Sequence, residues 1–262
     1  MRNPIVTLTT DFGLADHYAG TMKGVILSIC PRAQIVDISH EVTPFRIAEG
    51  AFVIAQAYRY FPSKTVHVVV IDPGVGTARR AVLVEAAGQY FVAPDNGALS
   101  MIYSREKSKV RLIENETLFL KPVSQTFHGR DIFAPMAAHI AAGTPVARIG
   151  KTIRDYVHPP FERPIQTGKQ VWRGCVLKID HFGNIITNFR ASEFPNLGRR
   201  RFVMAVGRRQ TSLAARDYEA PGPGRLFAIA GSSGFWEISA HQDSAARQAG
   251  CRAGDPVKLT TG

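Results

Sequence analysis

The chain has 262 residues, 45% hydrophobic and 20% charged, which is the composition of a soluble globular protein with one large domain or two smaller ones. It lacks both the apolar length of a membrane span and the basic start and apolar run of a signal peptide, so we expect no membrane partner. The net charge of +11 would suit nucleic acid. However, the tightest basic clusters, residues 199–201 and 208–209, lack a helix-turn-helix pattern or interleaved aromatic residues, which favours a solvated basic face and no nucleic-acid partner.

The first part of the chain alternates between strand and helix patterns. Short β-branched runs predict strands, and apolar residues at helical spacing predict helices. This alternation is typical of a largely parallel sheet covered by helices. Strands are expected at residues 5–9, 35–38, 68–71, 82–85 and 90–93, and helices at residues 18–29, 47–60, from Leu99 and 131–142.

The pattern changes around residues 155–170, where a polar stretch with three prolines predicts a linker. After it, strand signals alternate with turns rich in Gly and Pro, which indicates a small antiparallel barrel or sandwich. We therefore expect an α/β domain at residues 1–162 and an all-β domain at residues 163–262. Strands of the second domain are expected at residues 174–179, 185–189, 202–206, 226–230, 235–239 and 257–259.

The cysteines Cys30, Cys175 and Cys251 are scattered along the chain and odd in number. Disulfide frameworks of secreted proteins use paired cysteines, so this usage predicts a reducing compartment and a cytoplasmic location. The sequence has no CxxC pair, so we expect no structural zinc site.

The most informative segment is residues 68–80. An apolar β-branched run ends at Asp72, a Pro-Gly turn follows, and Arg79 comes seven residues later. A carboxylate placed at a sheet edge in this way can be reactive, and the arginine can keep it ionised or bind an anion beside it. An Asp that caps the turn and an Arg exposed to solvent are the alternative that this segment alone leaves open.

Three further clusters combine polar side chains with turns. Asp11 follows the first predicted strand, where it can accept hydrogen bonds from ribose hydroxyls or cap the next helix. His128 precedes a predicted helix, where it can polarise a substrate, move a proton or simply be a satisfied loop histidine. Phe182 beside Asn184 suits stacking on a purine whose edge the amide contacts, or an ordinary hairpin turn that begins at Asp180.

Other chemistry has little support in the sequence. The available carboxylates and His128 show no HxH, HExxH or DxD spacing, so no metal site is indicated. There is no Walker loop, no complete GxGxxG fingerprint and no GxSxG elbow.

Taken in order, the four clusters resemble the S-adenosyl-L-methionine (SAM) hydrolases, also called SAM hydroxide adenosyltransferases, which are relatives of fluorinase and chlorinase. The resemblance runs nearly from end to end and is specific as a set. Its motifs are TDFG at residues 10–13, YAGTMKG at 18–24, His40-Glu41 with Pro44-Phe45, EGA at 49–51, residues 72–79, APDNG at 93–97, TFHGRD at 126–131, DHFGN at 180–184 and GSSG at 231–234.

The resemblance implies an N-terminal α/β domain, a C-terminal β-barrel domain and a homotrimer that binds its ligand between neighbouring subunits. The catalytic Asp, Arg and His of the hydrolases correspond to Asp72, Arg79 and His128. The halogenases have a Tyr and a Thr where this chain has Asp72 and Val75. Since a carboxylate at that place would repel a halide, the resemblance favours hydrolysis over halogenation.

The resemblance also implies a set of substrate contacts. Asp11 would bind the ribose hydroxyls, while the halogenase arginine that meets the methionine carboxylate is Ser233 in this chain. The remaining expected contacts are Phe45 and Phe182 as walls of the adenosine site, Asn184 and Ala240 at the adenine, and Asp180, Ser232 and Glu237 at the methionine part.

The implied reaction is the conversion of SAM and water to adenosine and L-methionine, by in-line attack of water or hydroxide at the 5′ carbon. It requires no metal and no organic cofactor. Two other functions fit the same residues: a metal-dependent hydrolase of nucleosides or phosphoesters, and a non-catalytic module that binds adenosine or SAM.

Overall fold

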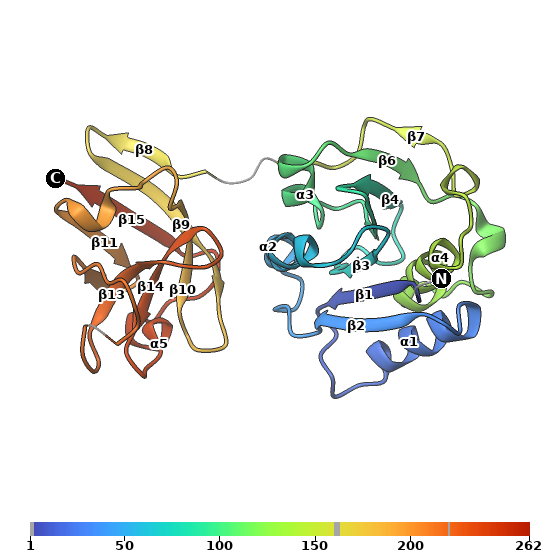
Figure 1. The fold of residues 1–262 in the computed structure, drawn as a ribbon, viewed down its shortest axis with the longest axis horizontal. Helices are drawn as coiled ribbons and strands as arrows, with labels where there is room; N and C mark the ends of the chain where they lie inside the picture. Colours follow the sequence, from blue (N-terminus) through green and yellow to red (C-terminus); the bar gives the residue numbers. More distant parts are fainter. Residues whose placement is uncertain (1–2, 160–162, 220) are drawn as a thin grey trace. The chain divides into compact units, whose positions relative to one another are not determined.

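The computed structural model describes residues 3–159, 163–219 and 221–262, and the chain divides into two compact units at residues 1–161 and 162–262 (Figure 1). Each unit contains its own sheet and its own apolar core. The boundary that the sequence predicts between residues 162 and 163 falls on residues outside those described. Within the described parts of the chain, no helix has the length and hydropathy needed to cross a membrane.

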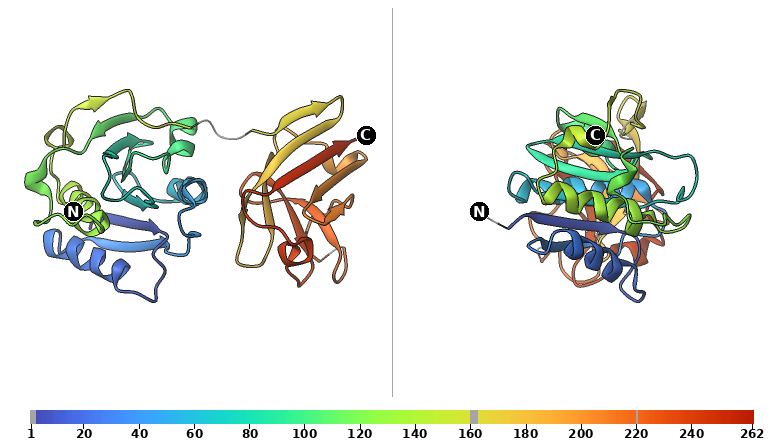
Figure 2. Two further views of the ribbon diagram at one scale, coloured as in Figure 1. Left: turned by 180° about the vertical axis from the view of Figure 1, so that it is seen from behind. Right: turned by 90° about the vertical axis from the view of Figure 1, so that its right-hand side faces the viewer.

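The N-terminal unit is an α/β structure. In Figures 1 and 2, α1 and α4 lie together beside the sheet, and α2 packs near α3. Its elements are β1 (Ile5–Thr10), α1 (Tyr18–Ile29), β2 (Gln34–Ser39), α2 (Ile47–Ala57), η1 (Tyr58–Tyr60), β3 (Val66–Val70), β4 (Ala81–Ala86), β5 (Gln89–Pro94), α3 (Ser100–Arg105), β6 (Lys109–Leu112), η2 (Glu116–Leu118), η3 (Gly129–Phe133), α4 (Ala134–Ala141), η4 (Val146–Arg148) and β7 (Thr152–Ile153).

The sheet of this unit is mixed, so the expectation of a largely parallel sheet is wrong in its second half. Its strand order within the described residues is β2-β1-β3-β5-β4-β6-β7. The pairs among β2, β1, β3 and β5 are parallel, whereas those among β5, β4, β6 and β7 are antiparallel. The reason is a direct hairpin: Ala87 and Gly88 both have positive φ angles, as a two-residue turn between β4 and β5 requires.

The predicted helices are largely confirmed, with one difference that bears on the site. α1 spans the expected residues 18–29, but the helix expected from Asp131 begins as a π-helical turn, η3, before α4. Pro135 explains the change, because it has no N–H to donate to the carbonyl of Asp131. That carbonyl instead accepts the N–H of Leu120 at 2.9 Å.

His67 is a buried histidine of β3 whose titration couples stability to pH. Its Nδ1 lies 2.7 Å from Oγ1 of Thr7, and its Nε2 lies 3.3 Å from Oε1 of Gln89. Burial lowers the pKa of His67 from 6.5 to about 4, against a smaller opposing effect of the Gln89 bond. Between these two pH values the unfolded chain therefore binds a proton more readily than the native protein does.

We expect the free energy of unfolding to fall by up to about 3 kcal/mol as the pH drops from 6.5 to 4, because protonation favours the unfolded chain. His67→Gln cannot gain this charge, so its stability should depend less on pH over that range. Urea denaturation at several pH values measures the difference. His17→Gln, at an exposed histidine of the same unit, should keep the wild-type slope. Parallel curves for wild type and His67→Gln would contradict this account.

The C-terminal unit is a barrel-like antiparallel sheet. In its described residues the strand order is β12-β11-β15-β9-β10-β14-β13, with β8 paired to β9. The ends of the sheet approach each other, because residues 213–215 hydrogen-bond to Ala228 of β13. Its elements are β8 (Ile165–Gly168), β9 (Val171–Ile179), β10 (Ile185–Arg190), η5 (Leu197–Arg199), β11 (Phe202–Val206), β12 (Arg209–Thr211), β13 (Leu226–Ala230), β14 (Phe235–Ala240), α5 (Ala245–Ala249) and β15 (Pro256–Thr261).

Two sequence expectations for this unit need correction. The unit is not entirely β, because Ser244 caps the short helix α5 by accepting the N–H of Arg247. The predicted linker at residues 155–170 includes β8, an exposed strand with no hydrophobic alternation that pairs with the edge of β9.

Candidate active site

An ion pair between Asp72 and Arg79 forms the centre of the candidate site in the N-terminal unit. β3 ends at Val70, and the buried Ile71 leads the chain to Asp72. Nε of Arg79 donates to both carboxylate oxygens of Asp72 at 2.9 Å, and its Nη2 donates to Oδ2. Only 5% of the Asp72 side chain and 10% of the Arg79 side chain are exposed, which contradicts the alternative of an arginine in solvent.

His128 joins this ion pair through one ring nitrogen. Nη2 of Arg79 lies 2.7 Å from Nδ1 of His128. A guanidinium group can only donate, so Nδ1 is the acceptor and the proton of the neutral ring is on Nε2. Burial and the charge of Arg79 lower the pKa of His128, against smaller opposing effects of Asp72, Asp131 and a hydrogen bond to the Ser124 backbone. The ring is therefore neutral at neutral pH.

The loops that contain Arg79 and His128 are in close backbone contact. Gly76 has a φ of +78°, and a Cβ added to it would lie 2.3 Å from the carbonyl oxygen of Gln125. Only glycine fits at this point. The Arg79 guanidinium also lies over the ring of Phe133, with Cζ 5.1 Å from the ring centroid. These contacts hold the arginine between the two loops.

The register of the parallel strands brings Asp11 to the same edge of the sheet. Thr10 at the end of β1 pairs with Val70 at the end of β3, so the residues that follow both strands are neighbours. Burial raises the pKa of Asp11, and the charge of Asp72 adds to this, against backbone hydrogen bonds that lower it. Three of the clusters found in the sequence therefore meet here.

Phe45 lies beside Asp11 in an unusual backbone conformation. Its N–H donates to Oδ2 of Asp11 at 2.9 Å, its φ is +68°, and 71% of the residue is exposed. Positive φ is costly for an aromatic residue, and such strain concentrates at functional sites. The exposed ring is available to a ligand at this edge.

The predicted cluster in the C-terminal unit is organised by Asp180. Its Oδ1 accepts the backbone N–H groups of Phe182 at 3.0 Å and Asn184 at 2.8 Å. Its Oδ2 accepts Nδ2 of Asn184 at 2.9 Å, which turns the amide oxygen of Asn184 away from Asp180. Phe182 is 76% exposed, while Asn184 is buried. An exposed ring beside an oriented amide is a suitable contact for a purine.

Glu237 of β14 lies close to this cluster and is buried. Oγ of Ser233 donates to its Oε1 at 3.5 Å, and the phenol of Tyr218 donates to its Oε2 at 3.3 Å. Burial raises the pKa of Glu237, and the charge of Asp180 adds to this, against both hydrogen bonds. Of the other predicted residues, Ser232 is exposed in the turn before β14, and Ala240 is buried at the end of β14.

The structure also reveals polar residues to which the sequence analysis gave no role. Tyr218 is one, and burial beside Glu237 raises its pKa to about 12. His40 is another: its Nδ1 lies 2.8 Å from Oγ1 of Thr10, directly before Asp11. His40 is part of the His40-Glu41 motif of the family resemblance, so the sequence could have pointed to it. Tyr218 lies in a loop without any periodic pattern, so the sequence could not.

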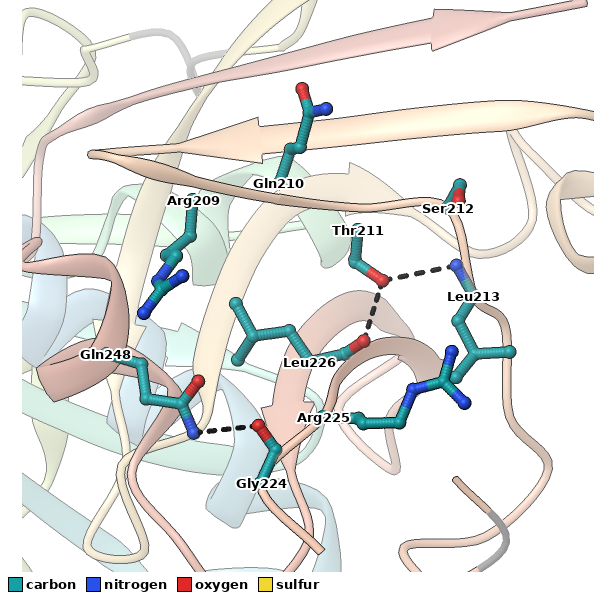
Figure 3. A pocket seen from close by; sticks show the side chains of 9 residues that line it. All are labelled: Arg209, Gln210, Thr211, Ser212, Leu213, Gly224, Arg225, Leu226 and Gln248. Carbon is teal, nitrogen blue, oxygen red and sulfur yellow. Dashed lines mark hydrogen bonds between the residues drawn. The ribbon is translucent and has the colours of Figure 1, made fainter. Parts of the chain in front are cut away.

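A cavity of about 340 Å³ lies elsewhere in the C-terminal unit, between β12 and β13 (Figure 3). Thr211 and Leu226 hydrogen-bond in its wall, and the side chains of Arg209 and Arg225 extend on opposite sides of Leu226. None of the predicted site residues is among the described residues that line it. We therefore do not assign the site to this cavity.

Among the described residues, no group of three or more His, Cys, Asp or Glu side chains is arranged to hold a metal ion. The carboxylates of Asp72 and Asp131 are instead paired with Arg79 and Arg130.

Comparison with known proteins identifies the family. Models of the N-terminal and C-terminal domains of SAM hydroxide adenosyltransferases match residues 6–150 and 174–258. Over 266 residues the chain is 35% identical to a protein of Salinispora tropica named (R)-S-adenosyl-L-methionine hydrolase, covering 99% of this chain and 98% of the relative. A relative of the same name from Methanocaldococcus jannaschii is 42% identical over 194 residues, which cover 72% of this chain and 68% of the relative.

A solved structure of an uncharacterized conserved protein from Thermotoga maritima has a TM-score of 0.89 and 38% identity to this chain. It covers 98% of this chain and 99% of its own. The two domain models together match most of the sequence, in the order that the motifs predict. The chain therefore belongs to the SAM hydroxide adenosyltransferase family.

Proposed function

We propose that this protein is an enzyme that hydrolyses SAM to adenosine and L-methionine. The observation that carries the proposal is the buried ion pair of Asp72 and Arg79 at one edge of the sheet, with the half-buried His128 bound to Arg79. Full-length relatives named (R)-S-adenosyl-L-methionine hydrolase support the same reaction.

The difficult part of this reaction is the nucleophile. The sulfonium leaves as a neutral thioether and needs no general acid, whereas water has to be oriented and stripped of a proton. Asp72 orients the water and accepts its proton, and Arg79 stabilises the negative charge that develops. His128 is neutral and accepts from Arg79, so it holds the guanidinium in place. The site also accelerates the reaction by holding the water in line with the departing sulfur, so that it attacks the 5′ carbon from the opposite side.

The substrate contacts follow from the two clusters. Asp11 binds the ribose hydroxyls, and Phe45 and Phe182 pack against the adenosine. The buried carboxylate of Glu237 and the half-buried carboxylate of Asp180 near it suit the ammonium and sulfonium charges of the methionine part of SAM. The other assignments are Asn184 and Ala240 at the adenine, and Asp180 and Ser232 with Glu237 at the methionine part.

The assembly that we propose is a cytoplasmic homotrimer. Each site would combine residues of two subunits. One subunit would contribute the Asp72 cluster (Asp11, Asp72, Arg79 and His128), and its neighbour would contribute the Asp180 cluster (Asp180, Phe182, Asn184 and Glu237). The reaction would require no metal or organic cofactor and would involve no nucleic acid or membrane.

Incubation of the purified protein with SAM, followed by chromatography of the products, tests this function. We expect adenosine and methionine to form at the same rate with and without EDTA. Loss of activity in EDTA that a divalent cation restores would indicate a metal-dependent hydrolase instead. Tight binding of SAM without turnover would indicate a non-catalytic binding module.

Asp11→Ala and Asn184→Ala should each weaken the binding of adenosine by about 1–3 kcal/mol, the usual cost of removing one partner from a buried polar contact. Calorimetry with adenosine measures this without catalysis. Asp155→Ala and Asn196→Ala, at exposed positions of the same units, serve as controls and should bind normally. Wild-type affinity in both test variants would remove Asp11 and Asn184 from the site.

A further inference from the structure

An asparagine in the turn after β5 holds the chain directly before Asp72. β3 ends at Val70, and the fully buried Ile71 leads from it to Asp72. A carbonyl group at so buried a position needs a hydrogen-bond donor. Nδ2 of Asn96 is that donor, and it lies 2.9 Å from the carbonyl oxygen of Ile71. The amide of Asn96 therefore fixes the path by which the chain leaves the sheet at Asp72.

The Asn96 side chain is itself held in place. Its Oδ1 accepts the backbone N–H of Ala98 at 3.1 Å, which closes an Asx turn and leaves Nδ2 free to donate to Ile71. The side chain thus uses both ends of its amide, one for its own turn and one for the chain that leads to Asp72.

The residue before Asn96 holds the other end of the same loop. Oδ2 of Asp95 accepts Nε and Nη2 of Arg80 at 2.9 and 2.7 Å, and the N–H of Asp95 donates to the carbonyl oxygen of Arg80 at 2.9 Å. Only 2% of the Asp95 side chain is exposed, so water competes little for these bonds. Residues 95 and 96 therefore hold the loop at both of its ends, beside Asp72 at one end and beside Arg79 at the other.

We propose that Asn96 is a positioning residue for the reaction: by holding the carbonyl group of Ile71 it fixes the direction of the Asp72 carboxylate. That carboxylate then faces both Arg79 and the water that attacks. The catalytic consequence rests on the proposed function, whereas the placing of Asp72 does not. Asn96 acts through Asp72 and not through contact with the substrate.

The kinetic test compares Asn96→Ser with Asn115→Ser. Serine can still accept the N–H two residues later, but its hydroxyl is one bond too short to reach the carbonyl group of Ile71. Asn115 is a matched control with no place in the candidate site. Its Oδ1 accepts the N–H of Thr117, and its Nδ2 donates to the carbonyl oxygen of Arg148, which is the same pair of bonds.

We expect Asn96→Ser to lower kcat about 10- to 100-fold, because a displacement of about 1 Å at a reacting group can cost that much. KM and adenosine affinity should change less than about threefold, since the substrate contacts are intact. Asn115→Ser should behave as wild type. Wild-type kcat in Asn96→Ser, or an equal loss in both variants, would overturn the proposal.

A double variant distinguishes positioning from general damage to the fold. If Asn96 acts through Asp72, adding Asn96→Ser to Asp72→Asn should cause no further loss of kcat. A further loss as large as that in the wild-type background would mean that Asn96 acts independently of Asp72, which would overturn the proposal.

Nitrogen-15 NMR of the arginine Nε–H groups tests the geometry without turnover, because Nε of Arg79 donates to both carboxylate oxygens of Asp72. Its signal is assigned by its absence in Arg79→Lys. We expect slow hydrogen exchange at this group in the wild type and in Asn115→Ser, and faster exchange in Asn96→Ser. Unchanged exchange in Asn96→Ser would overturn the proposal. If the wild type does not hydrolyse SAM, only the proposed function fails, because these spectra still test Asn96.

Asn96→Asp provides a second variant should the serine variant not fold. It keeps the size of the side chain and the acceptor for Ala98, but its carboxylate cannot donate to the carbonyl group of Ile71. The same faster exchange at Arg79 is expected, and wild-type exchange would contradict the proposal.

Discussion

Asp72→Asn is expected to lower kcat for SAM hydrolysis by about 10²- to 10⁴-fold while changing the affinity for SAM by less than about tenfold. The carboxylate acts on the water, whose proton is lost only as the reaction proceeds, so its removal affects the transition state more than the bound substrate. The amide keeps the size of the side chain and one acceptor for Arg79, but it cannot take a proton. Steady-state kinetics and calorimetry with SAM measure the two quantities separately.

A second acid-to-amide change controls for the loss of an ion pair. Asp155 pairs with Arg80 at 2.9 Å, directly beside Arg79 in the sequence, and 77% of its side chain is exposed. Asp155→Asn should therefore keep wild-type kinetics. Adenosine affinity at the wild-type level would show that the Asp72→Asn variant is folded. Normal turnover with a raised KM would show that Asp72 only binds substrate.

Mixing two impaired variants, His128→Ala and Asn184→Ala, should restore activity at a SAM concentration well below the wild-type KM, where both are nearly inactive, if each site combines halves from two subunits. The first variant has an intact Asp180 cluster, and the second has an intact Asp72 cluster. With random exchange in a cyclic trimer, about one quarter of the sites would pair two intact halves. Activity should therefore rise from near zero to about a quarter of the wild-type value.

The exchange has to be shown independently of activity. Subunits with different affinity tags, mixed under the same conditions, should be recovered together after exchange. If mixed trimers form and no activity returns, each site is built within a single chain. Light scattering that shows a fully active monomer would contradict the shared site more directly.

The sequence predicted those parts of the fold that have strong local patterns. The apolar run before Asp72 gave β3, and the spacing of Met22, Ile26 and their neighbours gave α1. It did not predict β7, β8 or β12, because each is short or lies at a sheet edge without regular hydrophobic alternation. β8 and β12 pair with the strands next to them in the sequence, β9 and β11, whereas β7 pairs with the more distant β6.

The same distinction applies to the candidate site. Asp72 and Arg79 are seven residues apart in a single loop, so the sequence could suggest their contact, although this segment alone left an exposed arginine as an alternative. The bond from Arg79 to His128 joins residues 49 positions apart and depends on two loops packing together, which no local pattern describes. The partnerships of Tyr218 with Glu237 and of Asn96 with Ile71 depend in the same way on tertiary packing. The roles of all these residues remain predictions for the experiments above.

The contact between Gly76 and Gln125 has a consequence for laboratory evolution of this enzyme. The position tolerates no side chain, because its conformation excludes one and the facing carbonyl occupies the space. A randomised library over this loop would lose nearly all members that change Gly76, whatever chemistry they were intended to introduce. Redesign of the nucleophile can therefore vary Asp72 and Val75, while Gly76 is the invariant point around which such a library has to be planned.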